Sequence, residues 1–151
     1  AGPKVLEFNA RFGDPEAQVL LPLLDCDLAE VLVAACEGKL GDVRLRWKPK
    51  TAVCVVAAAQ GYPDSPVKGQ TIHGLDGPLP QNTLVFCAGV DEQDGRLVTS
   101  GGRVLNAVGL GPDVRAAREA AYRVLGQVRF EGMHYRKDIG LRAVQAAGVE
   151  R

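Results

Sequence analysis

The chain opens, over residues 4–11, with a run in which apolar and polar residues alternate. An extended backbone would send the leucine, phenylalanine and alanine of this run to one side and Glu7, Asn9 and Arg11 to the other. The period of two predicts a β-strand with one apolar face and one face that carries three neighbouring polar groups.

Two helices are predicted to follow this strand. In the first, over residues 15–21, we expect Asp14 to cap the amino end and Pro15 to take the first helical position. Pro22 is expected to end or kink that helix. The second helix, over residues 27–37, contains a stretch that is apolar on every side, so we expect it to be mostly buried.

A polar and basic connection around Trp47 suggests a boundary between two units, residues 1–47 and residues 48–151. Beyond this boundary the pattern is typical of strands, which are β-branched and apolar and are separated by glycine and proline. Strands are expected over residues 51–59, 70–74, 84–90, 96–99 and 103–108, with a hairpin turn at Asp94-Gly95.

The clearest helical period lies in the carboxy-terminal third of the chain. It runs from Asp113 to Val128, with apolar residues three and four positions apart. Residues 130–142 show no clean period. Residues 48–151 are therefore expected to form a small β-rich domain with one packed helix, and the chain as a whole an α+β fold.

Composition narrows the possible function classes. Eighteen Lys and Arg balance eighteen Asp and Glu, so the chain has no net positive field and nucleic acid is not an expected partner. No apolar run approaches the ~20 residues that span a bilayer, and the amino end lacks the order of a signal peptide. We therefore expect no membrane partner and a cytoplasmic location.

The cysteines are expected to be buried, reduced thiols. They lie in apolar neighbourhoods without a C-x-x-C pair or a zinc-like spacing. The four are Cys26, Cys36, Cys54 and Cys87.

The polar face of the first strand is the first candidate for chemistry. Glu7 and Asn9 would have Cα atoms roughly 6.5 Å apart and could offer a carboxylate and an amide oxygen to magnesium shared with nucleotide phosphates. Arg11, next on that face, could clamp a carboxylate or a phosphate with two hydrogen bonds. The alternative is that the polar face is simply solvated.

Residues 4–16, which read K-V-L-E-F-N-A-R-F-G-D-P-E, resemble the strand, loop and helix start of the glycinamide ribonucleotide synthetases, or phosphoribosylamine–glycine ligases. Further strings that resemble this family follow in family order. They are G-Y-P at 61–63, I-H-G-L at 72–75, V-F and A-G within 85–89, T-S-G-G-R-V-L at 99–105, F-E-G at 130–132 and Y-R-K-D-I-G at 135–140. The resemblance thus extends over nearly the whole chain.

The resemblance implies an ATP-grasp ligase of de novo purine synthesis, which joins glycine to 5-phosphoribosylamine and cleaves ATP to ADP and phosphate through a glycyl phosphate. It implies that Glu7 and Asn9 bind Mg²⁺ or Mn²⁺ and that Arg11 is a catalytic residue beside the substrate. Gly13 and Asp14 would lie close to the same site, although helix capping alone explains Asp14.

A second candidate is the string Gly101-Gly102-Arg103. The glycine pair permits a close backbone approach to a ligand, and Arg103 could hold the ribose phosphate. The alternative is a hairpin corner with a solvated arginine.

Two histidines and one charged run complete the candidates. His73 and His134 could act as bases, but phosphoryl activation of a carboxylate needs no base from this region, so we expect structural or exposed histidines. Arg136-Lys137-Asp138 is expected to form a charged network that fixes the last segment, with substrate contact as the alternative.

The chain departs from the family pattern at its start. It begins with Ala1 and has Met133 as its only methionine. The resemblance implies that it opens within the last part of the ATP-grasp unit. We expect residues 1–47 to complete an ATP-grasp domain whose upstream part is needed, and the 151 residues alone to be inactive. The alternatives are another ATP-grasp carboxylate–amine ligase and a non-catalytic carboxy-terminal module.

Overall fold

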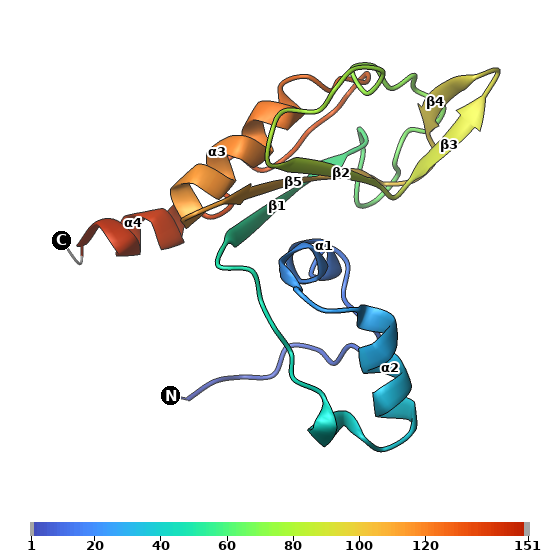
Figure 1. Ribbon diagram of the computed structural model, residues 1–151. Coiled ribbons are helices and arrows are strands. Elements are labelled where there is room, and N and C mark those ends of the chain that lie inside the picture. Colours follow the sequence, from blue (N-terminus) through green and yellow to red (C-terminus); the bar gives the residue numbers. More distant parts are fainter. Residues whose placement is uncertain (1, 150–151) are drawn as a thin grey trace.

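A computed structural model describes residues 2–149 and is built around a three-stranded antiparallel sheet (Figure 1). The strands are β1 (Thr51–Ala58), β2 (Thr83–Cys87) and β5 (Arg103–Gly111), in the spatial order β1-β5-β2. Helix α3 (Val114–Leu125) lies across one face of this sheet. The mixed helix and sheet domain that the sequence predicts for this part is confirmed.

The core lies between α3 and the inner face of the sheet. Alternate residues of β1, Val53, Val55 and Ala57, are buried there. Gly109 of β5 allows α3 to approach closely, because a Cβ at that position would lie 2.1 Å from the carbonyl oxygen of Ala117. Helix and sheet are therefore in contact through backbone as well as side chains.

The predicted helix near the carboxy end is confirmed, and so is its start. The carboxylate of Asp113 accepts a hydrogen bond from the backbone N–H of Ala116 at 2.8 Å. A further helix, α4 (Leu141–Val149), was not predicted and packs beside α3. Leu141, Val144 and Ala147 stand at helical spacing, which is the sequence signal for this helix.

The remaining strand predictions hold in part. Strands β3 (Val90–Gln93) and β4 (Arg96–Thr99) form the predicted hairpin around Asp94-Gly95. The single run expected over residues 84–90 is divided between β2, which pairs with β5, and β3, which pairs with β4. Residues 70–74 make only isolated bridges, from Thr71 to Val98 and from His73 to Arg129.

The amino-terminal third contains short helices and no buried residue among those described. Its elements are α1 (Ala17–Leu20), the 3₁₀ turn η1 (Leu21–Leu23), α2 (Leu28–Cys36) and the 3₁₀ turn η2 (Leu40–Asp42). Helix α1 lies against the sheet on the side opposite α3 (Figure 1). Pro22 stands where α1 gives way to the 3₁₀ turn, as expected.

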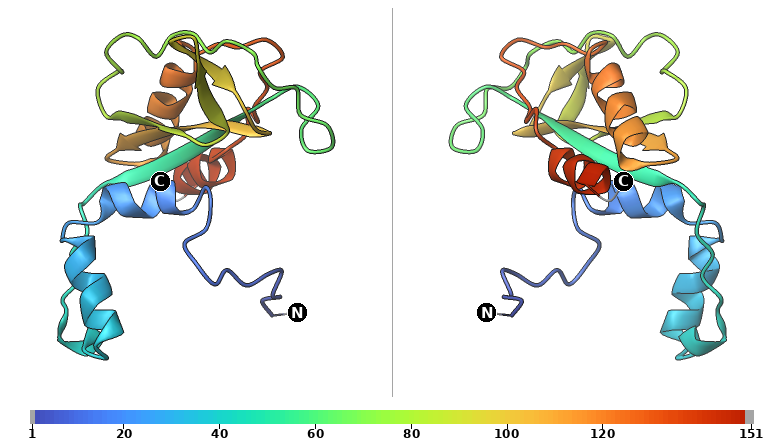
Figure 2. Two further views of the ribbon diagram at one scale, coloured as in Figure 1. Left: turned by 90° about the vertical axis from the view of Figure 1, so that its right-hand side faces the viewer. Right: turned by 90° about the vertical axis from the view of Figure 1, so that its left-hand side faces the viewer.

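The strand predicted over residues 4–11 is wrong for this structure. The segment is extended, leads away from the sheet and belongs to no strand (Figure 2). The physical reason is that a strand is held by hydrogen bonds to a neighbour, and no strand among residues 2–149 pairs with this segment. Its apolar side chains are consequently exposed, with Leu6 at 97% and Phe8 at 91%.

The expected burial of the second helix is also wrong. Asp27 caps α2 through the N–H of Ala29, and the helix has the predicted extent, but Leu32 is 47% and Val33 57% exposed. Its contacts within the described residues are chiefly with η2, so its apolar surface has no sheet to pack on. Residues within and next to the helix are enough to form it, but residues 2–149 do not bury its apolar side chains.

Asp14 does not cap α1, contrary to the prediction. The helix begins at Ala17 with Glu16 in the capping position and no side-chain cap, so Pro15 is not its first residue. The carboxylate of Asp14 instead accepts hydrogen bonds from Gln18 and from Arg103. A charged donor competes well with a backbone N–H for a carboxylate, which explains the difference.

The cysteines are free, but the expected burial of all four is wrong. Cys36 and Cys87 are exposed, whereas Cys26 and Cys54 are half-buried. Cys36 belongs to the exposed helix α2, and Cys87 is the last residue of the edge strand β2. Both thiols are therefore exposed although their neighbours in the sequence are apolar. Within residues 2–149 no helix has the length and apolar character needed to cross a bilayer.

Candidate functional site

Three predicted site residues lie side by side on the extended segment before α1. The amide nitrogen of Asn9 donates to Oε1 of Glu7 at 3.4 Å, and Nη1 of Arg11 donates to Oδ1 of Asn9 at 3.3 Å. All three side chains are exposed. The shared face that the sequence predicts is thus present, although the segment is not part of a sheet.

The donors on this face suit a hard cation. The side chains of Glu7 and Asn9, which offer a carboxylate oxygen and an amide oxygen, are joined by a hydrogen bond. Magnesium commonly takes one or two such protein ligands, while phosphate and water complete its coordination shell. No group of three or more His, Cys, Asp or Glu that could hold a metal occurs among residues 2–149. The pair therefore fits an ion shared with a ligand better than one held by protein alone.

An ion pair links this segment to the carboxy-terminal sheet. Nη2 of Arg103 lies 3.1 Å from Oδ2 of Asp14, and Nη1 donates to the backbone oxygen of Asp14 at 3.2 Å. Gln18 donates to the other carboxylate oxygen at 2.9 Å. Two residues that the sequence analysis considered separately are therefore in direct contact. Gln18 was missed, and no sequence signal would have found it.

The glycine pair before Arg103 is explained by packing. A Cβ at Gly102 would lie 2.4 Å from the ring of Tyr62, so the ring closes directly over this backbone. Gly101 lies against the backbone of Gly89, where an added Cβ on either glycine would crowd the other residue. The hairpin corner expected here is wrong, because residues 101–102 form a bend between β4 and β5, which belong to different sheets, and Arg103 is paired with Asp14 rather than only solvated.

A cleft of about 300 Å³ adjoins this ion pair on the outer side of β1. It is lined by Pro15, Arg103 and Tyr62 together with residues of the loop 134–139, and four residues of β1 contribute to its floor. Burial raises the pKa of the Cys54 thiol in this floor to about 12, with a smaller contribution from the charge of Asp14, so the group is a neutral thiol.

The loop after residue 134 is held by helix α3. Arg118 donates to the backbone oxygens of Lys137 and Ile139, at 2.6 and 2.9 Å. The hydroxyl of Tyr122 donates to the backbone oxygen of Arg136 at 2.7 Å. Arg136 in turn forms a two-point pair with Asp138 and lowers the pKa of that carboxyl below its usual value of 3.8. The charged network predicted here is present only in part, as the exposed Arg136–Asp138 pair, and the loop is held instead by Arg118 and Tyr122 of α3.

The two histidines are exposed, which agrees with the expectation. His134 pairs through its backbone with Ala58 and borders the cleft, whereas His73 pairs with Arg129 on another surface. The sequence alone does not distinguish the two histidines, because their neighbours come from segments far away in the chain.

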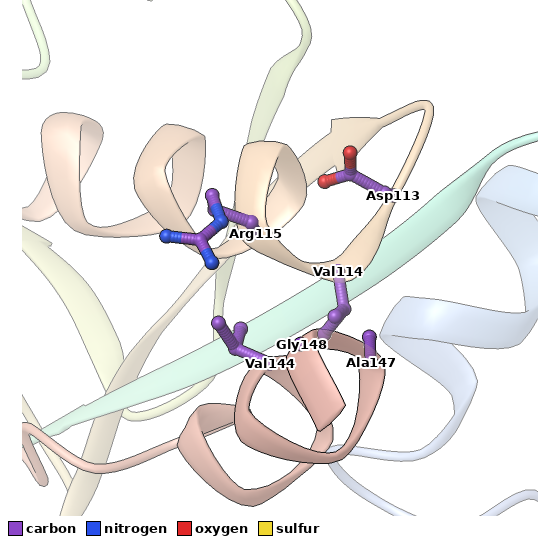
Figure 3. Close-up of a pocket in the computed structure, with 6 residues that line it drawn as sticks. All are labelled: Asp113, Val114, Arg115, Val144, Ala147 and Gly148. Atoms are coloured by element: carbon purple, nitrogen blue, oxygen red, sulfur yellow. The ribbon is translucent and has the colours of Figure 1, made fainter. Parts of the chain in front are cut away.

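A different cavity, of about 210 Å³, lies between the start of α3 and α4 (Figure 3). Asp113 and Arg115 contribute polar groups, Val114 points toward α4 beside Gly148, and Val144 points toward Arg115. The carboxylate of Asp113 is already engaged in capping α3. This cavity contains none of the predicted site residues.

A family model described as "Phosphoribosylglycinamide synthetase, C domain" matches residues 52–142. The chain is similar to proteins named phosphoribosylamine–glycine ligase in Caldanaerobacter subterraneus, with 53% identity over 138 residues, and in Caulobacter vibrioides, with 49% over 146 residues. These alignments cover 91% and 95% of this chain but 33% and 34% of the relatives.

A crystal structure of a phosphoribosylamine–glycine ligase from Thermotoga maritima matches with a TM-score of 0.70 at 43% identity. The match covers 91% of this chain and 33% of that one. The chain therefore spans about a third of the length of the proteins that it resembles.

Proposed function

We propose that this chain, which belongs to the phosphoribosylglycinamide synthetase C-domain family, is the carboxy-terminal part of a ligase that joins glycine to 5-phosphoribosylamine. The observation that carries the proposal is the family match over residues 52–142. The side-by-side arrangement of Glu7, Asn9 and Arg11 supports it, because phosphoryl transfer requires cations that neutralise the negative charge of the phosphate groups.

In the proposed reaction a carboxylate oxygen of glycine attacks the γ-phosphorus of ATP and ADP leaves. The amine of phosphoribosylamine then attacks the carbonyl carbon of glycyl phosphate, phosphate leaves, and the amine gives up a proton. Glu7 and Asn9 would hold Mg²⁺ or Mn²⁺, which when bound neutralises charge on the phosphates. Arg11 presents its guanidinium on the same face and would pair with an anionic oxygen of the substrate.

The proposed partner is the upstream part of the same enzyme. Leu6 and Phe8 are almost fully exposed, and the segment that carries them pairs with no strand of residues 2–149, so its backbone groups suit the edge of a sheet. Leu32 and Val33 of α2 add further exposed apolar surface. We therefore propose that residues 1–47 complete an ATP-grasp domain and that the 151 residues alone are inactive.

The test is ADP formation by the full-length enzyme that contains this chain. We expect ADP only when glycine, phosphoribosylamine, ATP and magnesium are all present. Glu7→Ala should abolish ADP formation while the circular dichroism spectrum stays unchanged, because the carboxylate is exposed and holds no part of the core. Glu30→Ala, the same change on the exposed start of α2, is the matched control and should keep full activity.

The outcomes separate the alternatives. ADP release with an acid other than glycine would favour a different carboxylate–amine ligase, and no ADP release from full-length protein would favour a non-catalytic module. Retained activity in Glu7→Ala would overturn the metal assignment alone.

A further inference from the structure

Two buried side-chain atoms find no hydrogen-bond partner among residues 2–149. They are Nδ2 of Asn106, on β5, and Oε1 of Gln18, on α1. The whole side chain of Asn106 is enclosed, since the residue is only 1% exposed. A buried amide group without a hydrogen bond costs stability, so both atoms require an explanation.

The side chain of Asn106 points to the layer that α1 covers. Leu105 and Ala107 of β5 belong to the core beneath α3. Asn106 stands between them, so its side chain points to the opposite side of the sheet. Helix α1 lies against that side (Figure 1). The thiol of Cys54, on β1, lies on the same side at 4.0 Å from Oδ1 of Asn106.

Asp14 brings Gln18 into the same neighbourhood. Nε2 of Gln18 donates to Oδ1 of Asp14 at 2.9 Å. Burial raises the pKa of the Cys54 thiol and the charge of Asp14 raises it further, which places this carboxylate near Cys54. Gln18, Asp14, Cys54 and Asn106 therefore form one polar cluster between α1 and the sheet.

The two unpaired atoms of this cluster are complementary. Nδ2 of Asn106 is a donor, whereas Oε1 of Gln18 is an acceptor. They form no direct hydrogen bond with each other. A water molecule both donates and accepts, so it can join two such groups across a longer gap. One ordered water between them would therefore satisfy both atoms.

The cluster also contains the contact that ties the segment before α1 to the sheet. The side-chain hydrogen bonds of the candidate metal ligands, Glu7 and Asn9, stay within residues 7–11. Asp14 follows this run and is bound to β5 through Arg103. The other carboxylate oxygen of Asp14 is held within the cluster. The position of the metal ligands relative to the sheet therefore depends on how firmly Asp14 is held.

We infer that Asn106 and Gln18 are positioning residues, joined through one ordered water that holds α1 against the sheet. They act on the candidate metal ligands, Glu7 and Asn9, through the carboxylate of Asp14. The effect on metal binding rests on the proposed function, whereas the contact between α1 and the sheet does not.

The contact is tested by amide hydrogen exchange in the full-length enzyme. Asn106→Val removes the donor with little change in size. If this amide were simply unpaired, an apolar replacement would leave α1 equally or better protected. We expect instead that the amide hydrogens of residues 16–20 exchange about 3- to 10-fold faster, the effect of losing one neutral hydrogen bond.

A second substitution tests the link between the two residues. Gln18→Met removes the acceptor, together with the hydrogen bond to Asp14. If a water joins the two residues, adding Asn106→Val removes a partner that is already lost, so the double variant should exchange less than about twofold faster than Gln18→Met. A crystal structure of the full-length enzyme should show the water within about 3.2 Å of both atoms.

Metal binding tests the positioning role. Titration of the full-length enzyme with Mn²⁺, with ATP present and glycine absent, gives a dissociation constant by electron paramagnetic resonance without turnover. We expect Asn106→Val to weaken Mn²⁺ binding by about 3- to 10-fold. Thr83→Val is the matched control, because it removes a buried hydroxyl that donates to Pro80 at another place in the same sheet. It should change neither Mn²⁺ binding nor exchange in α1.

Each part of the inference has its own contrary result. Exchange that is unchanged or slower in Asn106→Val overturns the contact, and so does a double variant in which the two effects multiply. Faster exchange with unchanged Mn²⁺ binding, or an equal loss in Thr83→Val, overturns the positioning role. A wild-type enzyme that makes no ADP from glycine and phosphoribosylamine overturns the proposed function, whereas the exchange measurement still decides whether the contact exists.

Discussion

The hydroxyl of Tyr122 is the contact through which α3 holds the loop beside the cleft, and its removal can be worked through quantitatively. It donates to the backbone oxygen of Arg136 at 2.7 Å and accepts from the N–H of Ile139 at 3.3 Å. Tyr122→Phe keeps the ring, which lies 6.1 Å from the ring of Tyr135 and beneath the guanidinium of Arg118. The change therefore removes two hydrogen bonds and little else.

The expected loss follows from these two bonds. The exposed carbonyl of Arg136 can turn to water, whereas the N–H of Ile139 is half-buried and would be left without its partner. At about 0.5–1.5 kcal/mol for each bond, with a further cost for the unpaired N–H, we expect a loss of about 2 kcal/mol in the free energy of unfolding. With a urea dependence of ~2 kcal/mol per molar, the midpoint should fall by about 1 M.

Urea denaturation followed by circular dichroism measures the midpoint, and amide hydrogen exchange at Ile139 reports the local bond. Tyr135→Phe is the matched control, because its hydroxyl makes no hydrogen bond to residues 2–149, and its midpoint should shift by less than about 0.25 M. An unchanged midpoint together with unchanged protection of Ile139 in Tyr122→Phe would refute the reasoning.

Three further outcomes are expected. Gly109→Ala should cost about 3 kcal/mol or more in unfolding free energy, measured by urea denaturation, because its Cβ would meet the backbone of α3 at 2.1 Å; a loss below 1 kcal/mol would contradict this. Asp113→Ala should cost about 1 kcal/mol by removing the cap of α3, whereas Asp113→Asn should cost little. Iodoacetamide at pH 8 should modify Cys36 and Cys87 and spare Cys54, because a pKa of about 12 leaves almost no thiolate; equal labelling by mass spectrometry would exclude that environment.

The sequence predicted those parts of the fold that depend on neighbours along the chain. Helix α3 follows from its period and from Asp113, and the β3–β4 hairpin follows from Asp94-Gly95. The shared face of Glu7, Asn9 and Arg11 also follows from spacing, since side chains two apart on an extended segment project together whether or not a sheet forms. Each of these features is decided within a few residues.

Predictions failed where the outcome depends on distant segments. Residues 4–11 have the pattern of a strand but pair with none of residues 2–149, and α2 has the pattern of a buried helix but lies exposed. The pattern of apolar and polar residues shows which face of a segment is suited to pack against a neighbour, but whether that neighbour is present depends on other parts of the protein. The proposed upstream part of the enzyme would provide the strand that pairs with residues 4–11 and the surface that buries α2.

By itself, the sequence determined helix α3 and the β3–β4 hairpin of the carboxy-terminal domain, the grouping of polar side chains before α1, and the motifs that mark the family. Only the tertiary structure decided that Asp14 pairs with Arg103, 89 residues away, and that a cleft forms between Arg103 and the loop held by α3. The reason is that hydrogen-bond spacing and helical period act over single turns, whereas an ion pair or a cleft exists only once the sheet has brought remote segments together.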